Sequence, residues 1–176
     1  MEYRCKYKTP PLFSDIIMSS NGSELTGLWF EDSADATKHH KKQTESFFDL
    51  QQNDLKIFAQ TALWLNKYFA GQNKLCDAPK FVLVNATPFR LDVLNIVSKI
   101  PYGKTITYGD IAKQLQKKYG IKKMSARAVG EAVGWNPICL IIPCHRVLGT
   151  DGKLTGYVGG LNNKIELLKL EKAIFN

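Results

Sequence analysis

A thiol and an imidazole stand side by side in residues 141–147, IIPCHRV, where Cys144 precedes His145 at the end of an apolar run. A cysteine attacks an electrophile as its thiolate, and it needs a nearby base or cation to ionise near neutral pH. Adjacency in sequence is weak support for such a pair, because neighbouring side chains usually diverge. From these two residues alone, Cys144 is either a structural cysteine or a nucleophile.

A carboxylate near the C-terminus is the candidate partner of this histidine. The segment LNNKIELLKLEKAIF predicts a helix with an inward stripe made of Leu161, Ile165, Leu168 and Ile174 or Phe175. Glu171 falls at or beside that stripe, and a buried carboxylate requires a partner. Glu171 would orient and charge His145, which would withdraw the proton of Cys144. The alternative is a solvent-reaching glutamate beside a structural cysteine, and these residues do not decide between the two.

The bulk properties are those of an ordinary globular protein. With 176 residues, 44% of them hydrophobic, the chain is long enough for one large domain or two small ones. The N-terminal stretch MEYRCKYKTPPLF lacks the apolar core of a secretory signal, and no run approaches the roughly 18 apolar residues of a membrane span. We therefore expect a cytoplasmic protein that does not contact membranes.

The cysteines and histidines outside this segment form no pattern typical of a metal or redox site. The four cysteines are Cys5, Cys76, Cys139 and Cys144. They include no C-x-x-C pair, we expect them to be reduced, and we predict that Cys139, inside the apolar ICLII, is structural. His39 and His40 lie in the polar, aperiodic segment 31–52, which favours a surface loop over a metal site. We predict no metal and no cofactor.

The charge is divided unevenly along the chain. Residues 1–85 contain ten Lys or Arg and ten Asp or Glu, whereas residues 86–176 contain fourteen and six. The net charge of +8 therefore comes from the C-terminal half, which would be attracted to a polyanion such as nucleic acid. General solubility is the alternative explanation, but it does not account for so uneven a division.

The first half predicts a small α/β domain over residues 1–82. Its apolar runs DIIMSS and LTGLWF flank an Asn-Gly turn, which is typical of a β-hairpin. Apolar residues at helical spacing predict a helix over residues 55–69, before Gly71. The segment KFVLVNAT that follows predicts either a buried strand or an extended linker.

The second half, residues 83–176, predicts mostly helices. Pro88 begins a helical pattern, and Thr107 opens the sequence TYGD, a capping-box start for the next helix. Ser125 can cap a further short helix, ARAVGEAVG. Two short helices joined by a turn resemble a helix-turn-helix, although that signal is weak on its own.

This last helix has a face of small residues around one long cation. Arg127, Gly130, Glu131 and Gly134 share that face, Ala126 is also small, and Val129 and Val133 lie opposite. Small residues permit the close approach of a partner. The alternative is that the glycines serve packing or capping, and the two interpretations carry equal weight before further information.

Four motifs together resemble one family. IPYGKTITYGDIA, SARAVGEAVGWNP, IIPCHRV and GYVGGLNNKIELLKLE occur in the order and spacing of the O6-alkylguanine-DNA alkyltransferases, also called methylated-DNA–protein-cysteine methyltransferases. The resemblance covers roughly residues 86–172. It implies a ribonuclease H-like α/β N-terminal domain and a C-terminal winged-helix-like helix-turn-helix domain. The first half, with LTGLWF, looks like the family's more variable domain.

The resemblance implies a DNA repair protein that acts once per molecule. Cys144 would take the alkyl group from O6-alkylguanine, chiefly O6-methylguanine, with O4-alkylthymine as a further substrate. His145 would deprotonate Cys144 through a water molecule, and Glu171 would hold His145. Asn136, in WNP, would tie the recognition helix to the active-site loop, although capping a turn before the following proline is its simpler role.

The resemblance also implies how double-stranded DNA is bound. The target nucleotide must leave the stack to reach a thiol, and Arg127 matches the residue that fills the gap. The helix carrying Ala126 and Gly130 would lie in the minor groove, and Tyr108 would crowd the target phosphate and serve N3 of the flipped base. We expect the protein to be a monomer.

The base pocket is where this chain departs from some relatives. Carbonyls of Cys144 and Val147 would recognise the exocyclic amine, and the segment with Tyr157 and Val158 would form the wall around O6. Some members carry serine where this chain has Val158, so only a backbone N–H can serve O6 here. The rival hypotheses are a catalytically silent lesion sensor, which would lack the nucleophile, and a Cys-His hydrolase, which would need an oxyanion hole and would turn over.

Overall fold

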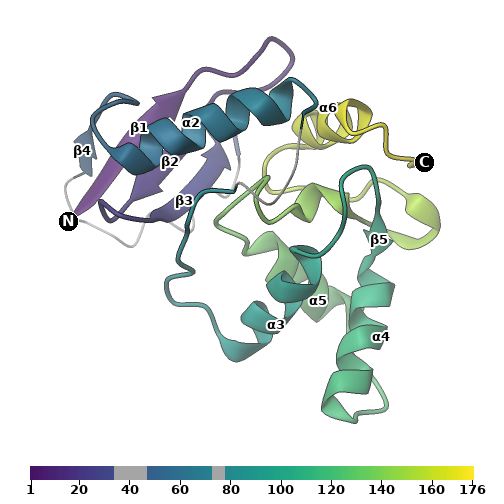
Figure 1. The fold of residues 1–176 in the computed structure, drawn as a ribbon. Helices are drawn as coiled ribbons and strands as arrows, with labels where there is room; N and C mark the ends of the chain where they lie inside the picture. Colours follow the sequence, from purple (N-terminus) through teal and green to yellow (C-terminus); the bar gives the residue numbers. More distant parts are fainter. Residues whose placement is uncertain (34–46, 73–77) are drawn as a thin grey trace.

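The computed structural model describes residues 1–33, 47–72 and 78–176, so His39, His40 and Cys76 lie outside the described residues. A small β-sheet with one long helix across it forms one part of the molecule, and shorter helices form the other (Figure 1). The N-terminal elements are β1 (Glu2–Tyr7), β2 (Ile16–Ser20), β3 (Leu25–Phe30), β4 (Phe47–Asp49) and α2 (Lys56–Phe69). The fold is thus α/β in its first half, as the sequence predicts.

The predicted hairpin is confirmed. Strands β2 and β3 pair antiparallel, with Ile16 opposite Phe30 and Met18 opposite Leu28. The connection is longer than a two-residue turn: Asn21 accepts hydrogen bonds through its side chain from the backbone N–H groups of Ser23 and Glu24. The side chain of Asn21 thereby replaces backbone partners in the turn.

The prediction that all of residues 31–52 form a loop is wrong at its C-terminal end. Residues Phe47–Asp49 form β4, which pairs parallel with β1 and completes the sheet order β3-β2-β1-β4. Three residues are too few to establish an alternating pattern in the sequence. Their partner strand lies more than 40 residues away, so the pairing depends on a non-local contact.

A continuous core joins the two halves of the chain. Helix α2 covers the sheet with buried residues that include Phe58, Leu65 and Tyr68. The segment KFVLVNAT is a linker that touches the sheet through one bridge, between Leu25 and Phe81. A second bridge joins Leu28 to Ile138 of the other half, and one cluster of buried apolar side chains extends through both.

The helices of the second half begin at the predicted caps. Their elements are α3 (Pro88–Val97), β5 (Ile106–Thr107), α4 (Tyr108–Tyr119), α5 (Ala126–Gly134), η2 (Cys144–Arg146), β6 (Val147–Leu148), η3 (Thr150–Gly152) and α6 (Leu161–Leu170). Thr107 and Asp110 form the predicted capping box, and Ser125 caps α5 by accepting from Ala128 N–H. These local interactions set where α4 and α5 start, and therefore which of their residues face outward.

The inward face of α6 is only partly the one predicted: Leu168 is buried as expected, but Leu161 and Ile174, the latter beyond the end of the helix, are not. Leu161 is 46% exposed and Ile174 is 88% exposed. The buried face instead carries Asn163, Lys164, Leu167, Leu168 and Glu171. Asn163 binds the backbone of Ser14 and Gly159, so polar residues with partners occupy positions that hydrophobicity alone would assign to solvent. In the described ranges, no helix combines the length and apolar character needed to cross a bilayer.

Candidate active site

The Cys144 sulfur is held in a short 3-10 turn directly after Pro143. Asn136 donates from Nδ2 to Sγ of Cys144 at 3.0 Å and to the carbonyl of Ile142 at 2.8 Å. The side-chain oxygen of Asn136 accepts from the N–H of Ile138 at 3.0 Å. One amide therefore ties the end of α5 to the loop and also places a donor on the sulfur, where it stabilises negative charge.

A second thiol lies against the first. The Cys139 thiol donates a hydrogen bond to Cys144 and, with the Asn136 amide and the charge of Lys164, lowers the pKa of Cys144 to about 7 despite burial. The pKa of Cys139 itself is raised well above its ordinary value, because it donates to Cys144 and is buried. Cys139 is therefore more than the inert structural cysteine predicted from its apolar surroundings: it helps to set the charge of its neighbour.

This contact predicts a shift in the pH dependence of Cys144. In wild type the reactivity of Cys144 toward iodoacetamide should rise with a midpoint near pH 7, the pKa of its thiol. Cys139→Ala removes a donor from the sulfur, so the midpoint should move upward by about one pH unit. Cys139→Ser keeps a donor and should stay closer to wild type. Equal midpoints in all three proteins would contradict the contribution of Cys139.

His145 and Glu171 form the predicted buried pair. His145 Nε2 lies 2.9 Å from Oε1 of Glu171, and both side chains are fully buried. Burial lowers the pKa of His145 in spite of the nearby carboxylate, so the imidazole is neutral near pH 7. With Nε2–H donating to Glu171, Nδ1 keeps a free lone pair, and it has no hydrogen-bond partner within the described residues. Nδ1 is the atom that can accept a proton.

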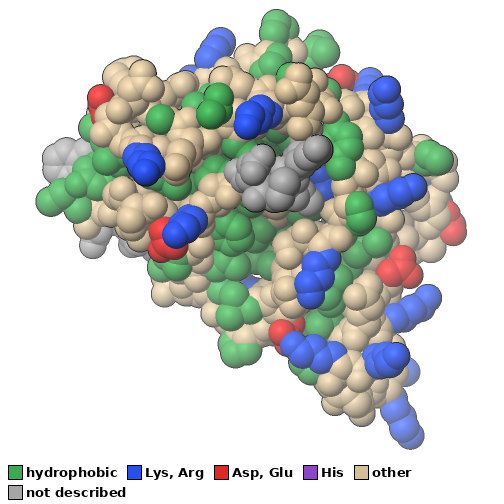
Figure 2. Space-filling view, in the orientation of Figure 1, with side chains coloured by type: hydrophobic (Ala, Val, Ile, Leu, Met, Phe, Trp, Pro, Cys, Tyr) green, Lys and Arg blue, Asp and Glu red, His purple; other side chains and the backbone are tan. Residues whose placement is uncertain are grey.

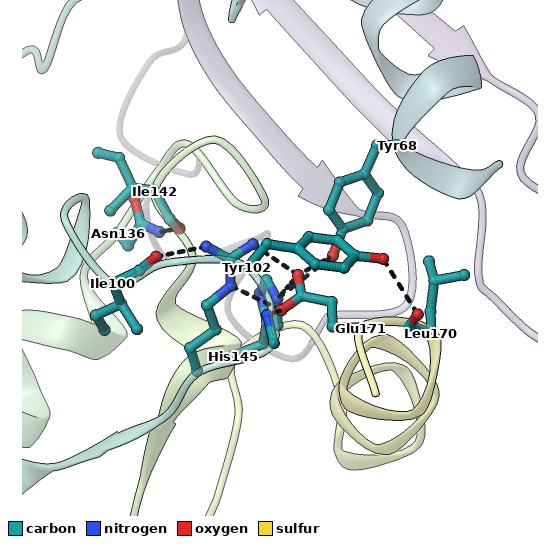
Figure 3. Close-up of polar contacts among 10 residues, drawn as sticks. Tyr68, Ile100, Tyr102, Asn136, Ile142, His145, Leu170 and Glu171 are labelled. Carbon is teal, nitrogen blue, oxygen red and sulfur yellow. Dashed lines mark hydrogen bonds and ion pairs between the residues drawn. The ribbon is translucent and has the colours of Figure 1, made fainter. Parts of the chain in front are cut away.

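Glu171 is surrounded by donors, and the main one was missed in the sequence. Arg146 donates from Nε to Oε2 at 2.8 Å and from Nη2 to Oε1 at 2.7 Å, with both side chains fully buried. Gly103 N–H donates to Oε2 at 3.2 Å. Burial would raise the pKa of Glu171, but its hydrogen bonds with His145 and Arg146 hold it well below its usual range. Figure 3 shows this cluster around Glu171.

Lys164 is a second functional candidate that sequence reasoning missed. Its residue is fully buried on α6, and Nζ donates to the carbonyl of Val147 at 2.8 Å. Burial lowers the pKa of Lys164 to about 8, while the neighbouring Cys144 opposes this shift. The cation favours the thiolate of Cys144 and joins α6 to the reactive loop. One signal in the sequence could have indicated its burial: Lys164 lies four residues before Leu168, and therefore on the same side of the predicted helix.

A pocket of about 310 Å³ opens over the sulfur. Its lining is Tyr108, Gly130, Val133, Gly134, Asn136, Cys144, Gly156, Tyr157 and Val158. The volume lies within the range of small-ligand sites. Six predicted site residues meet at this pocket, namely Tyr108, Gly130, Asn136, Cys144, Tyr157 and Val158. They come from the start of α4, from α5 and the residues after it, from the reactive turn and from the loop before α6.

Of two residues predicted to form the base pocket, Tyr157 lines it and Val147 does not. Val147 is fully buried and is absent from the lining, and its carbonyl accepts from Lys164. Tyr157 lines the pocket with a half-buried ring that lies under the Lys164 cation, 6.0 Å from Nζ to the ring centroid. The Tyr108 hydroxyl has its pKa raised by burial, which Thr155 partly offsets by hydrogen bonding. Tyr108 therefore stays a proton donor near neutral pH.

The pocket adjoins a wider hollow of about 870 Å³ on the surface. Both cavities are lined by Tyr108, Gly130, Gly134 and Gly156. The wider hollow, but not the pocket, is also lined by Ala126, Arg127 and Glu131. Arg127 is exposed over 89% of its side chain and pairs with Glu131 at 3.2 Å, a contact of little energetic value at such exposure. The face of α5 predicted to meet a partner therefore stands at the mouth of the reactive pocket.

Internal packing does not explain the glycines of this face. A Cβ added at Gly130 would lie 3.8 Å from the ring of Tyr108, and one at Gly134 would lie 3.5 Å from Cγ2 of Val158. Both are ordinary van der Waals distances. The small residues are therefore free to serve an outside partner that comes close to the helix.

Positive charge gathers beside this face. Figure 2 shows Lys and Arg side chains clustered around α4 and the turn after it, at the lower right of the view. The exposed lysines there are Lys113, Lys117, Lys118, Lys122 and Lys123. Such a cluster attracts a polyanion, in agreement with the uneven charge of the sequence.

Comparisons with known sequences find a matching family and relatives that share its name. The family model described as "6-O-methylguanine DNA methyltransferase, DNA binding domain" matches residues 88–173. The methylated-DNA–protein-cysteine methyltransferase of Methanosarcina acetivorans is 47% identical over 116 residues, which cover 66% of this chain and 70% of that protein. The protein of that name from Mycobacterium leprae is 37% identical over 168 residues, covering 96% and 92%.

Solved structures show the same fold over nearly the whole chain. The crystal structure of Mycobacterium tuberculosis O6-methylguanine methyltransferase gives a TM-score of 0.77 at 36% identity, with 98% of this chain and 93% of that chain covered. The structure of M. tuberculosis OGT in complex with DNA gives 0.78 at 34% identity, with 97% and 92% covered. The likeness therefore includes the N-terminal sheet as well as the helices around the pocket.

Proposed function

The chain belongs to the methylated-DNA–protein-cysteine methyltransferase family, and we propose from this premise that it is a DNA repair protein which takes the alkyl group of O6-alkylguanine onto its own Cys144. The substrate is chiefly O6-methylguanine in duplex DNA, with O4-alkylthymine as a further one. The observation that carries the proposal is the position of Cys144 under a pocket whose mouth is the exposed, small-residue face of α5.

The proton on Cys144 leaves by way of His145. Neutral His145 accepts it at Nδ1 through one water molecule, while Glu171 holds the ring through Nε2. The imidazolium that forms is stabilised by the charge of Glu171. Asn136 and Lys164 stabilise the thiolate that remains, and a pKa of about 7 keeps roughly half of Cys144 ionised at pH 7.

Alkyl transfer then exchanges one bond for another. The thiolate attacks the alkyl carbon, a C–S bond forms, and the C–O6 bond breaks with its electron pair going to guanine. The developing negative charge needs stabilisation by donors around the base. Tyr108 would donate to N3, and the backbone N–H groups of the loop with Tyr157 and Val158 would face O6, where Val158 offers no hydroxyl. The thioether has no route of reversal, so each molecule acts once.

Damaged DNA would reach this pocket with its nucleotide flipped out. We propose that α4 and α5 form a winged-helix-like helix-turn-helix with α5 in the minor groove, where Ala126 and Gly130 allow close approach. Arg127 would fill the gap in the stack, and Tyr108 would crowd the target phosphate. We also propose that the protein is a cytoplasmic monomer and that its N-terminal domain has a ribonuclease H-like fold.

Replacement of Arg127 by alanine should separate base delivery from chemistry. We expect Arg127→Ala to repair O6-methylguanine in duplex DNA more slowly, by about tenfold or more, because the flipped state loses the side chain that fills the stack. The reaction with free O6-benzylguanine should change little, provided that this base fits the pocket. Single-turnover rates on both substrates are the measurement, and equal losses on both would contradict the assignment.

A titration with excess substrate tests the proposed function. Duplex DNA containing O6-methylguanine is incubated with a limiting, known amount of protein, and the remaining lesion is counted at completion. The proposal predicts a plateau of one lesion repaired per protein molecule. A lesion sensor would bind the duplex and repair none, and a hydrolase would continue past one equivalent, so either outcome would overturn the proposal.

A further inference from the structure

Tyr68 reaches the reactive centre from the other half of the chain. It lies near the end of α2, where its side chain is fully buried, and its hydroxyl is 2.7 Å from Oε1 of Glu171. The same hydroxyl is 3.4 Å from Nε2 of His145. Figure 3 shows Tyr68 pointing from the side of the sheet toward Glu171. We infer that Tyr68 is a positioning residue for alkyl transfer, an inference that rests on the proposed function.

The hydroxyl of Tyr68 acts as a donor to the carboxylate. Burial and the nearby charge of Glu171 raise its pKa well above its ordinary value, so it remains protonated. Oε1 of Glu171 then accepts from Tyr68 at 2.7 Å, from Arg146 at 2.7 Å and from His145 at 2.9 Å. Because Tyr68 and Arg146 also donate to Oε1, they hold this oxygen in the position from which it accepts the hydrogen bond of His145.

Packing holds the hydroxyl in place. The ring of Tyr68 stacks on Trp64 at a centroid distance of 5.5 Å and an interplanar angle of 17°, and it meets Phe69 edge-on at 5.5 Å. These neighbours belong to the same helix, which lies across the N-terminal sheet. The sheet half of the protein thereby sets the position of a donor that the reactive half uses.

Loss of this donor should act on His145 in two ways. Without this donor, the negative charge of Glu171 is less neutralised and stabilises the imidazolium more strongly. The pKa of His145 should therefore rise, so that the base is already protonated at a higher pH. The ring would also be less firmly oriented, which slows proton removal from Cys144. We expect transfer at neutral pH to slow by about tenfold, which is the lower end of the effect that outer hydrogen bonds have on metal-binding histidines.

The test compares Tyr68→Phe with Tyr7→Phe. Both changes remove one tyrosine hydroxyl, and both rings pack against Phe69, but Tyr7 donates to Asn66 of α2 at 2.8 Å rather than to the reactive pair. Single-turnover methyl transfer from duplex O6-methylguanine is measured across pH, and the titration of His145 is followed by NMR of ¹⁵N-labelled histidine. Each rate is measured at a temperature where the variant is folded and is normalised to the fraction of protein that transfers a methyl group at completion, so partial unfolding does not obscure the comparison.

The expected result is specific to Tyr68. Tyr68→Phe should be about tenfold slower at neutral pH, with the acid limb of its rate profile and the pKa of His145 both moved upward, while Tyr7→Phe matches wild type. If Tyr68→Phe has the rate profile and the His145 titration of wild type, the inference is overturned. If wild type itself transfers no methyl group, the proposed function fails, and the NMR titration still decides whether Tyr68 acts on His145.

Discussion

Cys144→Ser should lose methyl transfer altogether while still binding DNA. A serine hydroxyl at this position ionises far less readily than a thiol whose pKa is about 7, and oxygen is the weaker nucleophile toward an alkyl carbon. We expect the rate to fall by more than about 10³-fold, below detection in a single-turnover assay. The residues of α5 that we propose face DNA are unchanged, so affinity for a duplex carrying O6-methylguanine should stay within about threefold of wild type.

Cys5→Ala is the matched control for this variant. Cys5 is a buried free thiol in β1, within the sheet and on the other half of the chain from the pocket. Its removal costs some packing but leaves the reactive turn intact. Wild-type transfer rates in Cys5→Ala, together with none in Cys144→Ser, would assign the chemistry to one sulfur. Substantial transfer in Cys144→Ser would exclude that sulfur as the acceptor.

Of the variants proposed around the reactive site, Glu171→Gln should lower the stability of the folded protein most. The change leaves the fully buried Arg146 without its counter-charge, and breaking such a pair costs about 3–5 kcal/mol. In a chain of this length, that corresponds to a fall in the melting temperature of roughly 10 °C. Transfer should also slow by about 10² or more at a temperature where the variant is folded, because His145 loses the carboxylate that stabilises its charged form.

The matched control is Glu166→Gln on the same helix. Glu166 pairs with Lys169 at 2.7 Å, but the lysine side chain is 59% exposed, and surface pairs of this kind contribute little. Thermal unfolding and single-turnover rates are measured for both variants. The account requires Glu166→Gln to resemble wild type. A Glu171→Gln protein that melts with wild type would show that the Arg146 pair does not stabilise the fold.

The stability lost in Glu171→Gln should depend on pH in a defined direction. Because the folded protein holds the pKa of Glu171 well below the ordinary 4.5, its stabilising effect is complete above that value. As the pH falls below 4.5, the unfolded chain takes up a proton that the folded chain does not, and the advantage of the wild type declines. The difference in melting temperature between the two proteins should therefore narrow in acid.

Features that depend on neighbours in the chain were predictable from the sequence. The capping box at Thr107 and the cap at Ser125 involve residues three apart, so the sequence alone places the starts of α4 and α5. The outward face of α5 follows from helical spacing once its start is known. Glu171 was expected on or beside the buried side of its helix for the same reason, and it is 2% exposed.

The residues that the sequence did not reveal are polar side chains buried through distant partners. Arg146 and Lys164 would ordinarily be assigned to solvent, since charged residues are seldom fully buried unless they are paired. Their partners, a carboxylate 25 residues away and a carbonyl 17 residues away, become visible only in the folded chain. Tyr68 is 103 residues from Glu171. No periodicity within one element encodes a contact of that span.

The inward face of α6 was misjudged for a related reason. A hydrophobic stripe was expected to face the core, but Asn163, Lys164 and Glu171 take buried positions because each has hydrogen-bond partners there. Leu161 and Ile174 are left exposed in exchange. Polar burial of this kind is costly unless it is satisfied. Among the described residues, the buried charged side chains are Arg146, Lys164 and Glu171, which belong to the network around the reactive turn.

The mass of the intact protein after reaction tests the central claim most directly. Wild-type protein is incubated with one equivalent of duplex DNA containing O6-methylguanine. Its intact mass is measured by mass spectrometry, and the protein is then digested to locate any modification. The account predicts that the protein gains one methyl group in place of one proton and that the methyl group lies on Cys144. An unchanged mass accompanied by loss of the lesion, or a methyl group on any other residue, would contradict it.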